Sequence, residues 1–117
     1  MNFKDLIAYQ RAKELNRICL ALIKKNKYYL PLYFKDQLGR SALSVALNIA
    51  EGSGRLTEKD QKHFFVMAKG SLREVEALVD MLEMFCEVSQ TNKEELNQLI
   101  DSIHRPLRGL INKNSNS

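Results

Sequence analysis

A line of polar side chains runs through an otherwise apolar stretch of the sequence, between residues 37 and 51. Its members recur at alternating spacings of four and three residues, which places them on one face of a helix: Gln37, Ser41, Ser44, Asn48 and Glu51. Arg40 and Arg55 flank this polar line. A polar stripe on an apolar helix must be exposed, line a channel or hydrogen-bond to another helix. The segment 70–76, which contains Ser71 and Glu74, is one candidate to face it.

Three interpretations of the polar line are open from the sequence. In the structural one, Asn48 and Glu51 pair with arginine or backbone groups and fix the register of two helices or a contact between subunits. In the second, Arg40 and Arg55 bind the phosphate groups of a ligand or a nucleic acid. The third is catalysis, which requires a second titratable group placed against Glu51. We favour the structural interpretation.

The remaining reactive side chains do not form a pattern typical of an active site or a metal centre. A two-metal site in a helical bundle needs repeated Glu-x-x-His pairs, which the sequence lacks. His63 and His104 are interpreted as surface or boundary residues. Cys19 and Cys86 have no second cysteine at a CxxC spacing and are predicted to be buried, reduced thiols on helices. We therefore expect no enzymatic activity, no metal and no cofactor.

Charge is distributed unevenly along the 117 residues, whose formal net charge is +4. Residues 1–29 are strongly basic, whereas residues 57–90 are acidic on balance. Four basic residues fall on the side of the first helix opposite its apolar stripe, and we call them the basic strip: Lys13, Arg17, Lys24 and Lys27. They are the candidate surface for binding RNA or DNA. The alternative is a solvated charge run on a protein that binds another protein.

Neither an apolar leader nor a stretch of the roughly 18 apolar residues that a membrane span requires occurs in the sequence. The expectation is a cytoplasmic protein with no membrane partner.

Hydrophobic periodicity predicts four helices, over residues of about 5–27, 33–52, 58–88 and 92–112. The second helix is apolar on more than one side and rich in small residues, so we expect it to be the most buried. Asp5, Thr57 and Thr91 are the predicted N-caps. Pro106 predicts that the last helix either kinks or ends and restarts, because proline frees the carbonyl of Ser102 four residues earlier.

Short connections between these helices favour antiparallel neighbours. The sequence thus predicts an all-α fold, an antiparallel up-and-down left-handed four-helix bundle. Residues 1–112 form one domain, and residues 113–117 are expected to be a disordered tail.

Three segments carry a resemblance to a known bacterial family. These are Phe3, Asp5 and Leu6, the run Gln37–Gly52 that ends in NIAEG, and the run Ala68–Glu74 that contains GSLRE. In these segments the chain resembles the four-helix bundle proteins that are encoded in intervening sequences of 23S rRNA genes. A more distant similarity extends to the accessory variability protein of diversity-generating retroelements.

The resemblance implies a bundle that assembles into a homopentameric ring and has no established enzymatic activity. The distant relative is also pentameric and binds nucleic acid and a reverse transcriptase. The expected partners are therefore further copies of the chain, with RNA or DNA or a protein as additional candidates.

Overall fold

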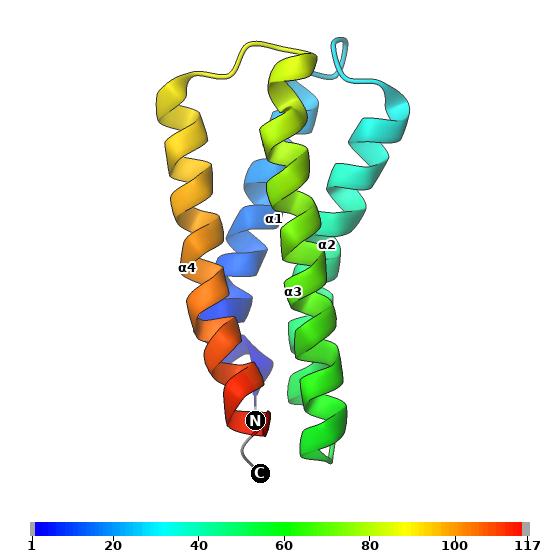
Figure 1. Cartoon of the computed structure of the whole chain (residues 1–117). Helices are drawn as coiled ribbons and strands as arrows, with labels where there is room; N and C mark the ends of the chain where they lie inside the picture. The colour runs from blue at the N-terminus through cyan, green and yellow to red at the C-terminus, as the bar shows by residue number, and fades with distance from the viewer. Residues whose placement is uncertain (1, 116–117) are drawn as a thin grey trace.

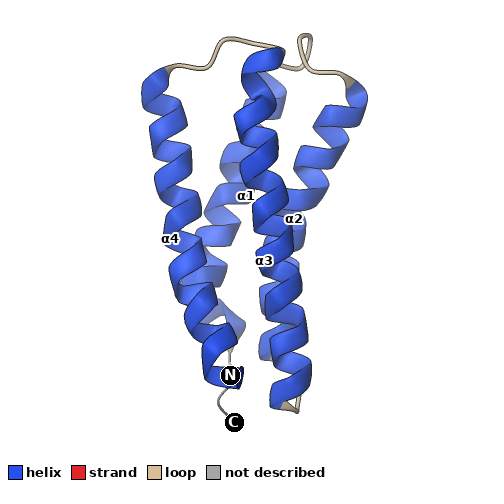
Figure 2. Ribbon diagram, viewed as in Figure 1, coloured by secondary structure: helices blue, strands red, loops and turns tan. Residues whose placement is uncertain are grey.

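A computed structural model describes residues 2–115 of the chain and shows four α-helices with no strand in that range (Figures 1 and 2). A 3-10 turn, η1 (Phe3–Asp5), precedes the first helix, and a second one, η2 (Leu82–Met84), follows the third. The four helices are α1 (Ile7–Lys25), α2 (Leu32–Ser53), α3 (Glu58–Met81) and α4 (Gln90–Ser115). The predicted all-α class and the four-helix bundle are confirmed.

The helices alternate in direction, so that each one is antiparallel to the helix before it (Figure 1). Loops join α1 to α2 and α3 to α4 at one end of the bundle, and the short α2–α3 turn lies at the other end. Each helix packs against two neighbours, in the order α1, α2, α3, α4 and back to α1. The pair α1 and α3 and the pair α2 and α4 therefore lie diagonally across the bundle.

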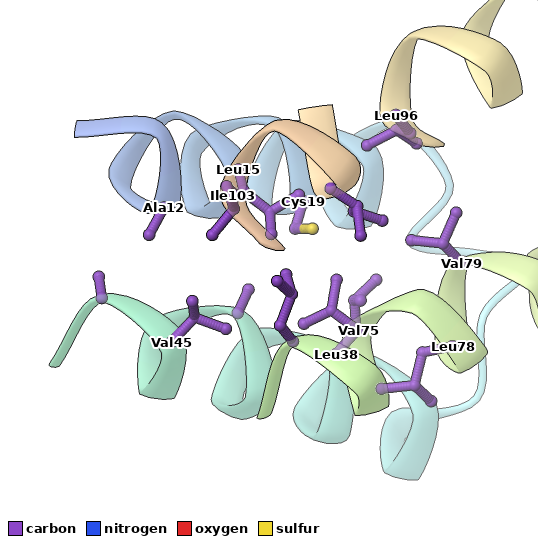
Figure 3. Close-up of a cluster of buried hydrophobic side chains, with 14 of the residues drawn as sticks. Ala12, Leu15, Cys19, Leu38, Val45, Val75, Leu78, Val79, Leu96 and Ile103 are labelled. Atoms are coloured by element: carbon purple, nitrogen blue, oxygen red, sulfur yellow. The ribbon is translucent and has the colours of Figure 1, made fainter. Parts of the chain in front are cut away.

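The core is a continuous apolar cluster to which all four helices contribute (Figure 3). Leu15 of α1, Ile49 of α2, Phe65 of α3 and Ile103 of α4 are each fully shielded from solvent. Apolar residues at alternating spacings of three and four supply this shared face, as the periodicity predicts. Burial of such side chains stabilises the fold by about 1.5–3 kcal/mol each.

Gly52 lies at a close approach between α2 and α3. A β-carbon at this position would lie 2.8 Å from Cε1 of Phe65 and 3.1 Å from Cβ of Phe64. Only glycine leaves room for α3 to cross at this distance, so the last residue of the NIAEG run is a packing requirement.

The first helix begins two residues later than predicted. Asp5 lies in the turn η1, and Leu6 occupies the N-cap position of α1 without a side-chain cap hydrogen bond. The capping side chain here is that of Asn2, which accepts a hydrogen bond from the backbone N–H of Lys4 at 3.0 Å. The prediction that Asp5 caps the helix is wrong, because a separate turn precedes α1.

The third helix ends at Met81, short of the predicted residue 88. The chain tightens into η2, after which the ring of Phe85 packs on Phe34 of α2 with centroids 4.9 Å apart. This inward turn keeps Phe85 in contact with the core and ends the regular helix. Cys86 lies beyond the helix and is half-buried, so the prediction of a buried helical thiol holds for Cys19 only.

The fourth helix begins earlier and ends later than predicted. The side chain of Ser89 accepts a hydrogen bond from the backbone N–H of Asn92 at 3.1 Å, so Ser89 caps α4 and Thr91 lies inside the helix. At the other end the helix continues to Ser115 and includes most of the predicted tail. Residues 116–117 lie outside the described residues.

Pro106 lies within α4, and the helix continues through it instead of ending and restarting. The proline leaves the Ser102 carbonyl without its usual intrahelical donor. Arg11 of α1 supplies a donor in its place, because its Nη1 lies 2.6 Å from the Ser102 oxygen. A contact between two helices thereby replaces the missing hydrogen bond within one of them.

Candidate functional site

The polar line of α2 faces α3, and together they form a polar seam whose members are Gln37, Ser41 and Ser44 of α2 and Ser71 and Glu74 of α3. The hydroxyls of Ser44 and Ser71 share a hydrogen bond at 2.8 Å. Ser41 donates a hydrogen bond to Oε2 of Glu74 at 2.9 Å, and Gln37 donates to the same oxygen at 3.2 Å. The structure thus brings the segment 70–76 against the polar line.

The second half of the polar line is bonded within α2 and to Arg55, just beyond the end of that helix. Asn48 donates to the backbone oxygen of Ser44 at 2.9 Å and to its hydroxyl at 3.0 Å. Glu51 forms an ion pair with Arg55 at 2.7 Å, and the Arg55 guanidinium lies over the ring of Phe64 at 4.4 Å from its centroid. Arg40 is exposed on the outer side of α2 and does not join these contacts.

The seam fixes the register between α2 and α3, because sliding one helix by a turn would separate both the Ser44–Ser71 and the Ser41–Glu74 pair. Within the described part of the chain, no buried side-chain nitrogen or oxygen atom is left without a hydrogen-bond partner. A fully satisfied polar network of this kind specifies one arrangement of the two helices.

Hydrogen bonding within the seam engages all three of its serine hydroxyls. Ser44 and Ser71 bond to each other, and Asn48 donates to the Ser44 hydroxyl, so neither of these two serines has a basic partner. Ser41 donates to the carboxylate of Glu74. In residues 2–115, no group of three or more His, Cys, Asp or Glu side chains lies close enough together to hold a metal ion. What the arrangement does is hold two helices in place.

Apolar side chains lie exposed on both sides of the seam. On α2, Leu43 and Leu47 are 46% and 58% exposed, and on α3, Val66 and Met67 are 46% and 37% exposed. At 100° per residue, Met67 continues the line of Ser71 and Glu74, whereas Leu43, Leu47 and Val66 fall on the outward sides of their helices. We call these four residues, with the exposed Gly70 between them on α3, the α2–α3 face. Exposed apolar side chains gathered in this way are typical of a contact surface.

Lys13, Arg17 and Lys24 of the basic strip lie on α1, whereas Lys27 falls in the loop after it, because the helix ends at Lys25 and not at the predicted residue 27. Since α1 contacts α2 and α4, the strip occupies a different part of the bundle from the α2–α3 face. All four of its side chains are exposed. Arg17 is paired with Glu14 at 2.5 Å, and the Lys27 ammonium lies 5.0 Å from the ring centroid of Tyr28. Lys13 and Lys24 point their charges into solvent.

A cavity of about 210 Å³ opens beside the basic strip, between α1 and α4. Its walls include Ile18, Leu22 and Leu96, with Arg17 at the rim. This cavity was not predicted, because the sequence does not show which residues of α1 lie beside the start of α4.

A second surface that sequence reasoning missed is a charged groove of about 500 Å³ between α3 and α4. It brings together Lys69 and Arg73 of α3 with Arg105 and Arg108 of α4. The spacing of four residues in the first pair and three in the second places each pair on one helix face, which is the only sign of the groove in the sequence. The acidic balance of α3 as a whole masks this sign.

The family model of the 23S rRNA-intervening sequence protein matches residues 4–109, which include the polar line, the seam and α4 as far as Gly109. The chain belongs to this family. In a comparison with curated proteins, none matches the chain. The matched range contains the NIAEG segment of α2 and the GSLRE segment of α3. None of the helices within residues 2–115 is both long and apolar enough to cross a lipid bilayer.

Proposed function

We propose that this protein is a non-enzymatic homo-oligomer, a pentameric ring as the family resemblance implies, that binds RNA or DNA through the basic strip of α1. The observation that carries the proposal is the separation of two surfaces. The α2–α3 face is apolar, whereas the basic strip lies along α1 and the loop after it. Assembly through the first surface leaves the second one free.

The α2–α3 face supports assembly because it exposes large apolar side chains that a single bundle does not cover. Leu47 is 58% exposed on a helix whose opposite side supplies much of the core. Burial of such surface against a second copy is favourable by about 25 cal/mol per Å² of apolar area. The hydrogen-bonded seam holds the exposed apolar residues of α2 and α3 in a fixed relative position. This reduces the entropy that is lost when two copies associate.

The basic strip supports nucleic-acid binding through charge and repetition. A ring of five chains with a net charge of +4 each would carry a formal charge of about +20. Lys13 and Lys24 are free to contact phosphate groups, and repeated weak contacts add up when several copies engage one strand.

The oligomer is tested by light scattering coupled to size-exclusion chromatography. We expect the wild-type protein to elute as a multimer and Leu47→Lys to elute as a smaller species. Leu20→Lys is the matched control, because Leu20 is also about half-exposed, at 48%, but lies on α1. A wild-type monomer at micromolar concentration, or equal effects of the two substitutions, would contradict assembly through the α2–α3 face.

Nucleic-acid binding is tested by fluorescence anisotropy with a labelled structured RNA and the matching DNA at several salt concentrations. We expect affinity to fall steeply with salt, and Lys13→Gln/Lys24→Gln to reduce the salt slope by roughly one to two. Lys59→Gln on α3 is the control for loss of one exposed lysine. No binding even at low salt would rule out this part of the proposal.

The second candidate is a structural adaptor that docks a protein without nucleic acid. The apolar cavity between α1 and α4 favours it, because Ile18, Leu22 and Leu96 offer a place for an apolar side chain of a partner. After nuclease treatment, the adaptor should still retain one stoichiometric protein, and that complex should re-form from purified components. Ala21→Glu at the cavity wall should weaken the complex without affecting RNA binding.

A further inference from the structure

The groove between α3 and α4 has two facing rows of basic side chains. Lys69 and Arg73 are one helical turn apart on α3, and Arg105 and Arg108 are one turn apart on α4. Their helices pack side by side, so the four cations line one opening of about 500 Å³. Four cations face two carboxylates there, those of Glu76 and Asp101, which leaves the groove with a positive balance.

These cations are not engaged by the protein. The ion pairs within residues 2–115 are Arg17–Glu14, Arg55–Glu51 and Lys93–Glu83, and none involves a residue of the groove. Arg11, Arg17 and Arg55 all donate hydrogen bonds to protein oxygens. Arg73, Arg105 and Arg108, by contrast, have no such bond in the described part of the chain. Their guanidinium forks therefore keep their donors available for an acceptor from outside.

The donor set identifies the chemistry of that acceptor. Guanidinium groups match the oxygens of phosphate in paired hydrogen bonds, and a lysine ammonium adds a point charge. Three arginines and a lysine around one opening offer more hydrogen-bond donors and more positive charge than a single carboxylate ligand would use. Phosphate oxygens, which carry more charge and more acceptors, fit this set.

His104 lies in the same groove and provides a probe of its occupancy. Partial burial lowers the pKa of His104; the nearby carboxylates of Glu76 and Asp101 act in the opposite direction, and Arg73 and Arg108 reinforce the decrease. Lys69 and Arg105 are the other charged groups that line the groove. A phosphate among these cations would offset their charge and favour the protonated imidazole.

We infer that the α3–α4 groove is a binding site for phosphate groups, in which Arg73 and Arg105 face each other across the ligand. The phosphate comes either from a small phosphorylated molecule or from the backbone of a nucleic acid. The site is separate from the basic strip of α1 and does not depend on the nucleic-acid binding proposed for that strip.

The test is an NMR titration of the His104 imidazole in a His63→Gln background, which leaves a single histidine signal in the chain. Inorganic pyrophosphate is the probe in one arm, and a short single-stranded RNA is the probe in the other. With either occupant, we expect the pKa of His104 to rise by about one unit. A response to both probes means that an isolated phosphate group suffices, and a response to RNA alone assigns the site to a nucleic-acid backbone.

Matched variants separate this site from the other cationic surfaces. Arg73→Gln/Arg105→Gln should weaken the response about tenfold or more, because two bidentate donors are lost. Arg40→Gln, an exposed arginine on α2, should leave it unchanged, as should Lys13→Gln/Lys24→Gln on the basic strip. Circular dichroism checks that the double variant is folded.

Two results would overturn the inference: no response of His104 to either probe, or a response that persists in Arg73→Gln/Arg105→Gln. RNA binding that is lost in Lys13→Gln/Lys24→Gln without any response of His104 would retain the proposed function and remove this site.

Discussion

Nη1 of Arg11 donates a hydrogen bond to the backbone oxygen of Ser102 at 2.6 Å. This carbonyl is the one that Pro106 deprives of an N–H donor, since a proline nitrogen carries no hydrogen. A side chain of α1 therefore completes the hydrogen bonding of α4. The contact joins the two helices and lets α4 continue past its proline.

Replacement of Arg11 by alanine should lower the free energy of unfolding by about 1–3 kcal/mol, because the partly buried Ser102 carbonyl loses its charged donor. In a Pro106→Ala background the helix regains an N–H for this carbonyl, so the same substitution should cost about 1 kcal/mol less. Urea unfolding of the four proteins of this cycle measures the difference.

Lys13→Ala is the control for this cycle, since Lys13 is exposed on the same helix and has no contact with Ser102. Its effect should be the same in the wild-type chain and in the Pro106→Ala background. If Arg11→Ala were equally costly in both backgrounds, the arginine would not be compensating for the proline.

The second prediction concerns the seam between α2 and α3. Ser44→Ala and Ser71→Ala should each lower the free energy of unfolding by about 1 kcal/mol. The double variant should lower it by less than the sum, because each substitution removes the same hydrogen bond. Ser53→Ala is the control, since its hydroxyl donates to the Ala50 carbonyl at 2.8 Å, away from the seam. Its cost should add to that of Ser71→Ala. Additive Ser44 and Ser71 effects in thermal unfolding would show that the seam does not couple the helices.

The helices could be predicted because each keeps its core residues at helical spacing over several turns, as Ala8, Ala12, Leu15 and Cys19 do. Their ends could not. The predicted α3 was too long because Leu82 and Phe85 continue the apolar spacing without a glycine or proline to stop it. Ser89 and Thr91 are both acceptable caps, and only the path of the chain after η2 decides in favour of Ser89.

The seam could be predicted in part, since the polar line and the segment 70–76 both have polar residues at helical spacing that need hydrogen-bond partners. The donor for the Ser102 carbonyl could not be predicted, because Arg11 is 91 residues away in sequence and is one of seven arginines. The same holds for the α3–α4 groove. Its cations become neighbours only when the alignment of two helices is known.

The third prediction concerns the close crossing at Gly52. Gly52→Ala should destabilise the protein by about 1–3 kcal/mol, because the new methyl group would meet the Phe65 ring and must displace it. Gly109 is a matched control in α4, where a β-carbon would have no neighbour within 4 Å. Gly109→Ala should therefore stabilise the protein by about 0.5–1 kcal/mol through helix propensity. Destabilisation of similar size at both positions would contradict this account of Gly52.

The fourth prediction uses the burial of Cys19, which raises the pKa of its thiol to about 12. In the unfolded chain a cysteine ionises near pH 8.5, so above that pH the unfolded state releases a proton that the folded state retains. The free energy of unfolding should consequently fall as pH rises from 8 to 11, by at most about 1.4 kcal/mol per unit from this group.

Cys19→Ala removes that contribution, so the unfolding free energies of wild type and variant, measured in urea at pH 8 and at pH 10.5, should converge as pH rises. Tyrosine and lysine ionise in both proteins and cancel in the comparison. Cys86→Ser is the matched control, because Cys86 is only half-buried and should contribute a smaller pH dependence. Cys19 is a buried core residue of α1, so its thiol should ionise less readily in the folded protein than in the unfolded chain. A constant difference between wild type and Cys19→Ala would contradict this prediction.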